Sequence, residues 1–139
     1  MNQTVRNILA VLAGIFSFIV GIMGLHVLTG LIIEMPPFPA GEADTPENWV
    51  AFMQGLSVLQ ILTALISHIG GTFIGAWVAA RISNDGKLIV PLVVAFIAMI
   101  GGILNVFQIP GQPLWFILTD ISFYLPAGLL AGHLAGRKR

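Results

Sequence analysis

The chain has 139 residues, of which 57% are apolar and 9% are charged, and its formal net charge is zero. Water-soluble domains have about 45–50% apolar and about 25% charged residues, so this composition excludes a water-soluble core and indicates one integral membrane domain, 1–139. The absence of cysteine excludes disulfides, thiolate metal sites and a cysteine nucleophile.

The first apolar block, residues 5–33, carries a single charge, Arg6. It exceeds the roughly 20 residues that a helix needs to cross the hydrocarbon core. It also exceeds the apolar core of about 7–15 residues in a secretory signal, so we expect it to remain as the first span. The acidic, proline-rich stretch 34–47 cannot continue a helix through Pro36 and Pro37, and is predicted to be an external loop.

The Thr-Pro-Glu sequence at 45–47 has the order of an N-cap, a first-turn proline and a first-turn acid, which predicts the start of a helix. The second span is assigned to 48–81. Because this range is too long for one crossing, we expect the part from Trp49 to about Gln60 to lie at or above the outer interface, with Trp49 as an aromatic anchor.

The third span is predicted at 88–109, after a short polar loop at 83–87. Two prolines in the sequence IPGQP predict an outer turn, and Trp115 marks the outer interface again. The fourth span, 113–136, ends against a basic tail. The predicted fold class is therefore an all-α membrane protein, a bundle of four transmembrane helices.

The positions of the charges predict the orientation of the chain. All basic residues lie at the N-terminus, in one short loop or at the C-terminus: Arg6, Arg81, Lys87, Arg137, Lys138 and Arg139. Most acids lie elsewhere: Glu34, Glu42, Asp44, Glu47 and Asp120, with Asp85 as the exception. By the positive-inside rule, both termini and the 82–87 loop are cytoplasmic.

Residues 62–81 align without a gap with residues 118–137, and Arg81 then coincides with Arg137. This alignment favours a duplicated two-helix hairpin, with parallel halves related by an axis along the membrane normal. Coincidence in a biased composition is the alternative.

Small residues recur at every fourth position in spans two and four. Positions four apart share one helix face, and small side chains let helices approach closely in lipid. We predict helix-packing seams, within the chain or between subunits, at Gly71, Gly75, Ala79, Gly128, Gly132 and Gly136.

Farther toward the outer side, the same faces become polar. An ionisable group inside a membrane span costs a few kcal/mol, so it normally faces protein or water and is a functional candidate. The candidate ligand-binding residues are His68, Asp120, Tyr124, Asn105 and Gln108. For each of them, a hydrogen bond between helices without any ligand is the alternative. His26 and His133 are expected at the interfaces.

The sequence offers no pattern for catalysis or for a metal. There is no HExxH pair, and Ser67 and His68 are adjacent on a helix and point apart. We therefore expect no metal, no cofactor and no enzymatic activity. Without a phosphate loop or a basic face, nucleic acid and nucleotides are not expected as partners either.

Three stretches resemble a known family: HIGGTFIGAWVAARI at 68–82, GGILNVFQIPGQPLWFILTD at 101–120 and YLPAGLLAGHLAG at 124–136. The family consists of uncharacterised, small, four-span bacterial integral membrane proteins. The resemblance covers spans two to four, and span one only in length and glycine content. It implies the same fold and polar cluster in a bacterial inner membrane, and it implies no activity.

Two functions follow from these patterns. The leading hypothesis is a periplasm-facing polar pocket that binds or transports a small solute or ion, with His68 and Asp120 as titratable members. A homodimer is expected, because four spans make a thin wall for a pathway. The competing hypothesis is a noncatalytic accessory or assembly subunit of a larger membrane complex, in which the polar residues only fix helix register.

Overall fold

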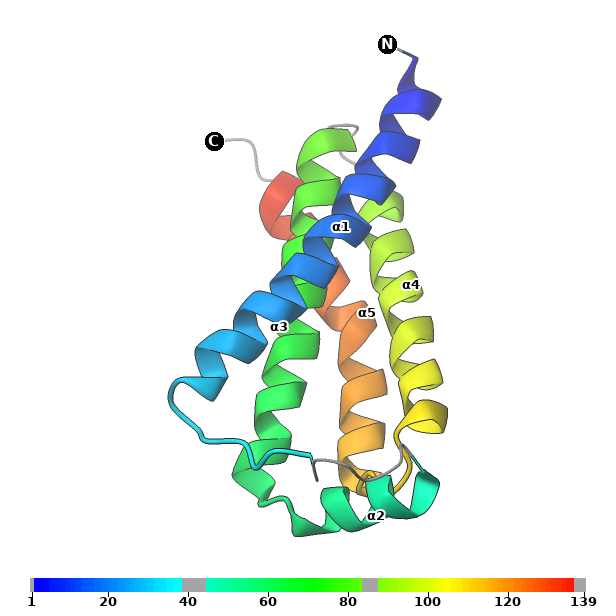
Figure 1. Cartoon of the computed structure of the whole chain (residues 1–139). Helices are drawn as coiled ribbons and strands as arrows, with labels where there is room; N and C mark the ends of the chain where they lie inside the picture. The colour runs from blue at the N-terminus through cyan, green and yellow to red at the C-terminus, as the bar shows by residue number, and fades with distance from the viewer. Residues whose placement is uncertain (1, 39–44, 84–87, 137–139) are drawn as a thin grey trace.

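The computed structural model describes residues 2–38, 45–83 and 88–136. These residues form an all-α bundle of five helices: α1 (Gln3–Gly30), α2 (Pro46–Gly55), α3 (Val58–Ser83), α4 (Ile89–Gln108) and α5 (Leu114–Gly136) (Figure 1). Four of these helices, all except α2, are long and apolar enough to cross a membrane. The predicted fold class, a bundle of four membrane-crossing helices, is confirmed.

The two ends of the bundle differ. We call the end where α1 begins and α5 finishes the terminal end, and the opposite end, across which α2 lies, the α2 end (Figure 1). Several charges used for the predicted orientation lie outside the described residues: Glu42, Asp44, Asp85, Lys87, Arg137, Lys138 and Arg139. Arg6 lies at the terminal end, where its guanidinium donates a hydrogen bond to the carbonyl of Ile82 near the end of α3.

The predicted second span, 48–81, is divided into two helices. Thr45 caps α2 as predicted, with its side chain accepting a hydrogen bond from the Asn48 amide, and the helix ends at Gly55. Leu56 is extended, and Ser57 and Gln60 then cap α3 reciprocally: the Ser57 amide donates to Gln60 Oε1 at 2.8 Å and the Gln60 amide to Ser57 Oγ at 3.3 Å. This capping box starts a new helix, so α2 turns away from the bundle axis.

The turn between α4 and α5 holds α2 in place. Gly111 in this turn has a φ of 88°, a conformation that favours glycine, and a Cβ added to it would lie 2.7 Å from Cα of Val50 in α2. On the other side, Phe38 packs against Trp49 and Phe52, with ring centroids 4.6 and 5.3 Å apart. The short helix α2 is therefore packed across the α2 end.

Helix α3 is the centre of the bundle and contacts α1, α4 and α5. It approaches α1 through small residues: a Cβ on Gly75 would lie 2.7 Å from Cβ of Phe18, and a Cβ on Gly14 would lie 2.8 Å from Cβ of Ala79. Gly71 meets Ile22 of α1 in the same way. The predicted seam in span two is thus an internal contact between α3 and α1.

The predicted seam in span four is also internal. Gly128 packs against Ala95 of α4, and a Cβ on Gly132 would lie 2.8 Å from Cγ of Pro91. Gly136 differs, because an added Cβ would have no atom of the described residues within 4 Å. It therefore takes no part in this contact. The duplicated hairpin stays a prediction.

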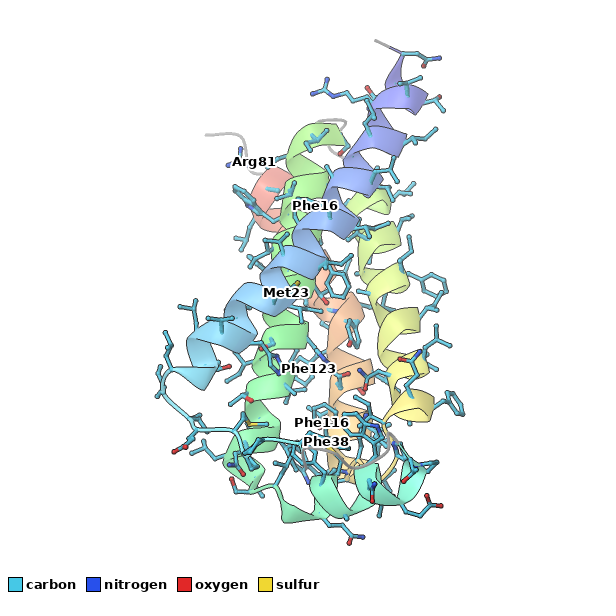
Figure 2. All side chains as sticks on the ribbon, in the orientation of Figure 1. Phe16, Met23, Phe38, Arg81, Phe116 and Phe123 are labelled. Atoms are coloured by element: carbon cyan, nitrogen blue, oxygen red, sulfur yellow. The ribbon has the colours of Figure 1, made fainter. Side chains whose placement is uncertain are left out.

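The outer surface of the bundle is apolar, as a membrane protein requires. On α1, which has few buried residues, Phe16 and Met23 point outward with 69% and 65% of their surface exposed (Figure 2). Exposed side chains of this kind in water would be unusual for a monomeric domain, whereas in a bilayer they contact lipid.

The seam between α1 and α3 predicts a difference between two glycines. Gly75→Ala is expected to lower the free energy of unfolding in detergent by about 1–3 kcal/mol, because the added methyl group has no room beside Phe18. Gly24→Ala should cause no loss, because among residues 2–38, 45–83 and 88–136 no atom lies within 4 Å of the new methyl group. Equal stability of the two variants, measured by SDS-driven unfolding, would contradict this packing.

Candidate functional site

A cluster of three hydrogen-bonded side chains joins α3 and α5. His68 Nδ1 lies 3.0 Å from Oδ1 and 3.1 Å from Oδ2 of Asp120, and the Tyr124 hydroxyl donates to Oδ2 of Asp120 at 3.0 Å. We call these three residues the His-Asp-Tyr cluster. Asp120 and Tyr124 are only 4% and 2% exposed. His68 lies about 15 Å along α3 from its start at Val58, well inside the span.

The cluster satisfies a carboxylate that would otherwise be costly to bury. An ionised carboxylate is only an acceptor, so His68 Nδ1–H and the Tyr124 hydroxyl are its donors. Among the described residues, no buried side-chain nitrogen or oxygen lacks a hydrogen-bond partner. The remaining nitrogen of the imidazole, Nε2, forms no hydrogen bond within the described part of the chain, and the His68 side chain is 14% exposed.

The position of Tyr124 depends on a glycine in α4. A Cβ on Gly102 would lie 2.8 Å from two carbons of the Tyr124 ring, so any larger residue would displace this ring. The rings of His68 and Tyr124 stack with their centroids 6.4 Å apart, and Phe116 lies on another side of the His68 ring at 6.3 Å. Three helices therefore fix the geometry of the cluster.

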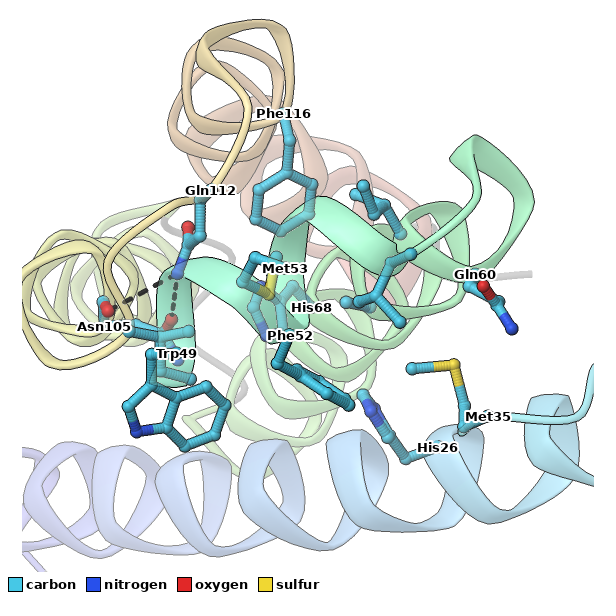
Figure 3. A pocket seen from close by; sticks show the side chains of 14 residues that line it. His26, Met35, Trp49, Phe52, Met53, Gln60, His68, Asn105, Gln112 and Phe116 are labelled. Carbon is cyan, nitrogen blue, oxygen red and sulfur yellow. Dashed lines mark hydrogen bonds between the residues drawn. The ribbon is translucent and has the colours of Figure 1, made fainter. Parts of the chain in front are cut away.

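A cavity of about 260 Å³ lies between the cluster and α2, and we call it the α2 pocket (Figure 3). Its wall is mostly apolar, including Trp49, Phe52 and Met53 from α2, and Phe116 from α5. Polar side chains are few: His26, Gln60, His68, Asn105 and Gln112. A largely apolar wall with a few convergent polar groups is typical of small-molecule sites, and the volume is near the lower end of their range of about 300–1,000 Å³.

A second cavity, of about 210 Å³, lies between α1 and α4, and we call it the lateral cavity. Phe18 and Ile22 of α1 form one wall, and Gly101 and Gly102 of α4 belong to the other. Tyr124 of α5 also lines this cavity. His68 and Asn105 line both this cavity and the α2 pocket, so these two residues separate the cavities.

The structure brings together four of the five predicted ligand-binding residues. His68, Asp120 and Tyr124 form the cluster, and Asn105 lines both cavities beside His68. Gln108 is exposed and lines none of the described cavities. Three residues after Asn105, a side chain is rotated by about 60° around the helix, which turns Gln108 away from the bundle.

Gln112, and not Gln108, is the glutamine that lies beside Asn105 in the candidate site. Its amide nitrogen donates to Oδ1 of Asn105 at 2.8 Å, and it lines the α2 pocket (Figure 3). Sequence reasoning missed it because it lies in the turn after α4, where helical periodicity no longer applies. Its position between Pro110 and Pro113, which return the chain to the bundle, was the available signal.

Two of the histidines were predicted at the interfaces. His26 of α1 lines the α2 pocket (Figure 3). His133 is exposed near the end of α5. Residues 2–38, 45–83 and 88–136 contain no group of three or more histidines and acids that could hold a metal.

The fold and the site define a multi-pass α-helical membrane protein with a histidine, a carboxylate and a tyrosine bonded together inside the bundle. No protein-family model, curated protein or solved structure matches this chain. The resemblance to the four-span bacterial family therefore stays a prediction.

The cluster predicts that the Tyr124 hydroxyl contributes to stability. Tyr124→Phe removes one donor from a buried carboxylate on the same helix and is expected to lower the free energy of unfolding by about 1–3 kcal/mol, the cost of leaving a buried polar group without one of its partners. Ser122→Ala is the matched control: it also removes a hydroxyl from α5, but Ser122 is exposed and bonds only to the Leu118 carbonyl of its own helix. If Ser122→Ala costs as much as Tyr124→Phe in SDS-driven unfolding, the cluster does not stabilise the bundle.

Proposed function

We propose that this chain is a bacterial inner-membrane protein, not an enzyme, whose α2 pocket opens to the periplasm and binds a small solute or ion. The observation that carries the proposal is the His-Asp-Tyr cluster, whose His68 lines a largely apolar pocket. An ionisable pair inside a membrane span costs free energy, so it is a candidate for a functional site.

The state of His68 supports a role in binding. Its Nδ1 is held by Asp120, which fixes the orientation of the ring, and the other nitrogen has no partner among the described residues. The same arrangement, in which a carboxylate orients a histidine and leaves its second nitrogen available, serves metal binding and proton transfer in other proteins. In this chain, Nε2 is the atom best placed to contact a ligand.

The orientation rests on charge. Arg6 and Arg81 lie near the terminal end, and the sequence places the remaining basic residues beside the same helix ends. Glu34 and Glu47 belong to the α2 end. The positive-inside rule then makes the terminal end cytoplasmic and the α2 end periplasmic. Transport would require α1 or the α4–α5 pair to move against α3 along the glycine contacts, and a homodimer would give the pathway a thicker wall.

One observation favours the second candidate function, an accessory or assembly subunit without a ligand. Every buried side-chain polar atom among the described residues already has a partner, as expected if the cluster only fixes the register of α3 against α5. This candidate predicts that His68→Asn is tolerated and that the protein copurifies with a larger complex.

The binding function predicts an effect of His68 on ligand-induced stability. In a thermal-shift screen of small solutes and ions in detergent, a ligand at 100 times its Kd should stabilise the protein by about 2.7 kcal/mol. His68→Ala should remove this stabilisation, and so should the double variant His68→Ala/Asp120→Ala. His133→Ala, at the exposed position near the terminal end, should retain it. If a ligand stabilises His68→Ala as much as the wild type, it binds at a site that does not include His68.

The proposed orientation predicts the accessibility of single cysteines, which can be introduced directly because the chain has none. Gln54→Cys on α2 and Gly136→Cys at the end of α5 are both at exposed positions. A membrane-impermeant maleimide should label Gln54→Cys in spheroplasts, and Gly136→Cys only after permeabilisation. The reverse pattern would place the α2 pocket on the cytoplasmic side.

A further inference from the structure

The lateral cavity begins where α1 and α4 separate. Near the terminal end the two helices are in contact, where Ala10 of α1 packs in one buried cluster with Val90 and Val94 of α4. Beyond this contact α1 leans away from α4 toward the α2 end (Figure 1). The lateral cavity lies in this part of the bundle, between Phe18 on one side and Gly101 on the other.

The surface around this cavity faces lipid. Gly101 is exposed, and within the described part of the chain a Cβ added to it would have no atom within 4 Å. The neighbouring side chains on the surface are large, apolar and exposed, Ile19 and Met23 on α1 and Ile100 and Leu104 on α4. Gly101 both lines the cavity and is exposed on this apolar face, which favours access to the cavity from the hydrocarbon region beside Gly101.

The polar groups of the site can be reached from this side. His68 and Asn105 line the lateral cavity as well as the α2 pocket, so a molecule between α1 and α4 would meet the same two side chains. The rest of the lateral wall, apart from the Tyr124 hydroxyl, is apolar or glycine. A molecule that fits this path therefore has a polar group at one end and an apolar body.

The hydrogen-bonding groups specify the polar end. An imidazole that carries one proton, on the Nδ1 that faces Asp120, presents the lone pair of Nε2 as an acceptor. The Oδ1 of Asn105 accepts from Gln112, which leaves the Asn105 amide hydrogens as donors. A hydroxyl group both donates and accepts, so it can bond to both residues at once. A neutral hydroxyl also crosses lipid at a lower cost than a charged group.

We infer that the ligand of this site is a lipid-soluble alcohol or phenol that enters from the bilayer between α1 and α4, with its hydroxyl beside His68 and Asn105 and its apolar body past Phe18 and Gly101. This inference rests on the proposed binding function and narrows its ligand to a neutral amphiphile. Tyr124 and Asp120 act as positioning residues, because they hold the His68 ring.

The test compares two probes with the same head group, phenol and 4-octylphenol, on the full chain in lipid nanodiscs. A form of 4-octylphenol with a diazirine in its tail reports the location of the tail by crosslinking, and the unlabelled probes compete with it. For the wild type, we expect the crosslinks on α1 and α4 around Phe18 and Gly101. We also expect His68→Ala to reduce crosslinking at least tenfold.

The entrance is tested by closing it. Gly101→Leu should reduce crosslinking by the octyl probe at least tenfold. The affinity for phenol, which can enter through the α2 pocket, should stay within twofold when it is measured by thermal shift. Gly24→Leu is the matched control, because it places the same side chain at an exposed glycine of α1 with no atom within 4 Å of its Cβ. In case the leucine impairs folding, Gly101→Cys can be folded first and then closed with N-ethylmaleimide, with Gly24→Cys as its control.

The outcomes separate this inference from the proposed function. Unchanged crosslinking after Gly101 is closed, or crosslinks equally distributed over all exposed helix faces, would overturn lateral entry. If phenol and 4-octylphenol both fail to bind while stabilisation by a soluble ligand from the thermal-shift screen requires His68, the inferred ligand class is wrong and the proposed binding function stands. If no ligand of either kind depends on His68, both are wrong.

Discussion

The structure depends on one constraint, the burial of the Asp120 carboxyl group inside an apolar bundle. A carboxylate in this position costs several kcal/mol unless hydrogen-bond donors surround it. Its two donors lie at very different distances from Asp120 in the sequence. Tyr124 is one turn away on α5, whereas His68 belongs to α3. The hydrogen bonds to His68 therefore set the register of α3 against α5, and every element packed on these helices inherits that register.

Glycine makes this register possible. Gly102 leaves room for the Tyr124 ring, and Gly128 lets α5 approach Ala95 of α4. On the other side of α3, the contact of Gly75 with Gly14 and Phe18 brings α1 close at the terminal end. Because lipid supplies no hydrophobic force between helices, close packing of this kind and hydrogen bonds supply most of the association. The same tight crossing lets α1 diverge from α4 toward the α2 end, where the cavities lie.

Much of this arrangement could be predicted from the sequence, because a membrane imposes strong patterns. The long apolar blocks predicted the four spans, and the four-residue spacing from Gly128 to Tyr124 and Asp120 predicted that these residues share one helix face. The break at Leu56 and the role of Gln112 could not be predicted in this way. Both lie outside regular helix, where periodicity carries no information and local caps and turns decide the direction of the chain.

A ligand site and a purely structural cluster can be distinguished by asking which features are needed to fix the register of α3 against α5. Fixing α3 against α5 needs one bond between them, and His68 Nδ1 supplies it. Fixing the register does not require that Nε2 of His68 lack a partner among the described residues. It also does not require cavities on two sides of the His68 ring. Close packing would fill such spaces with side chains, as it does where Gly75 of α3 meets Phe18 of α1. The cavities beside His68 are therefore the feature that a structural role leaves unexplained and a binding role accounts for.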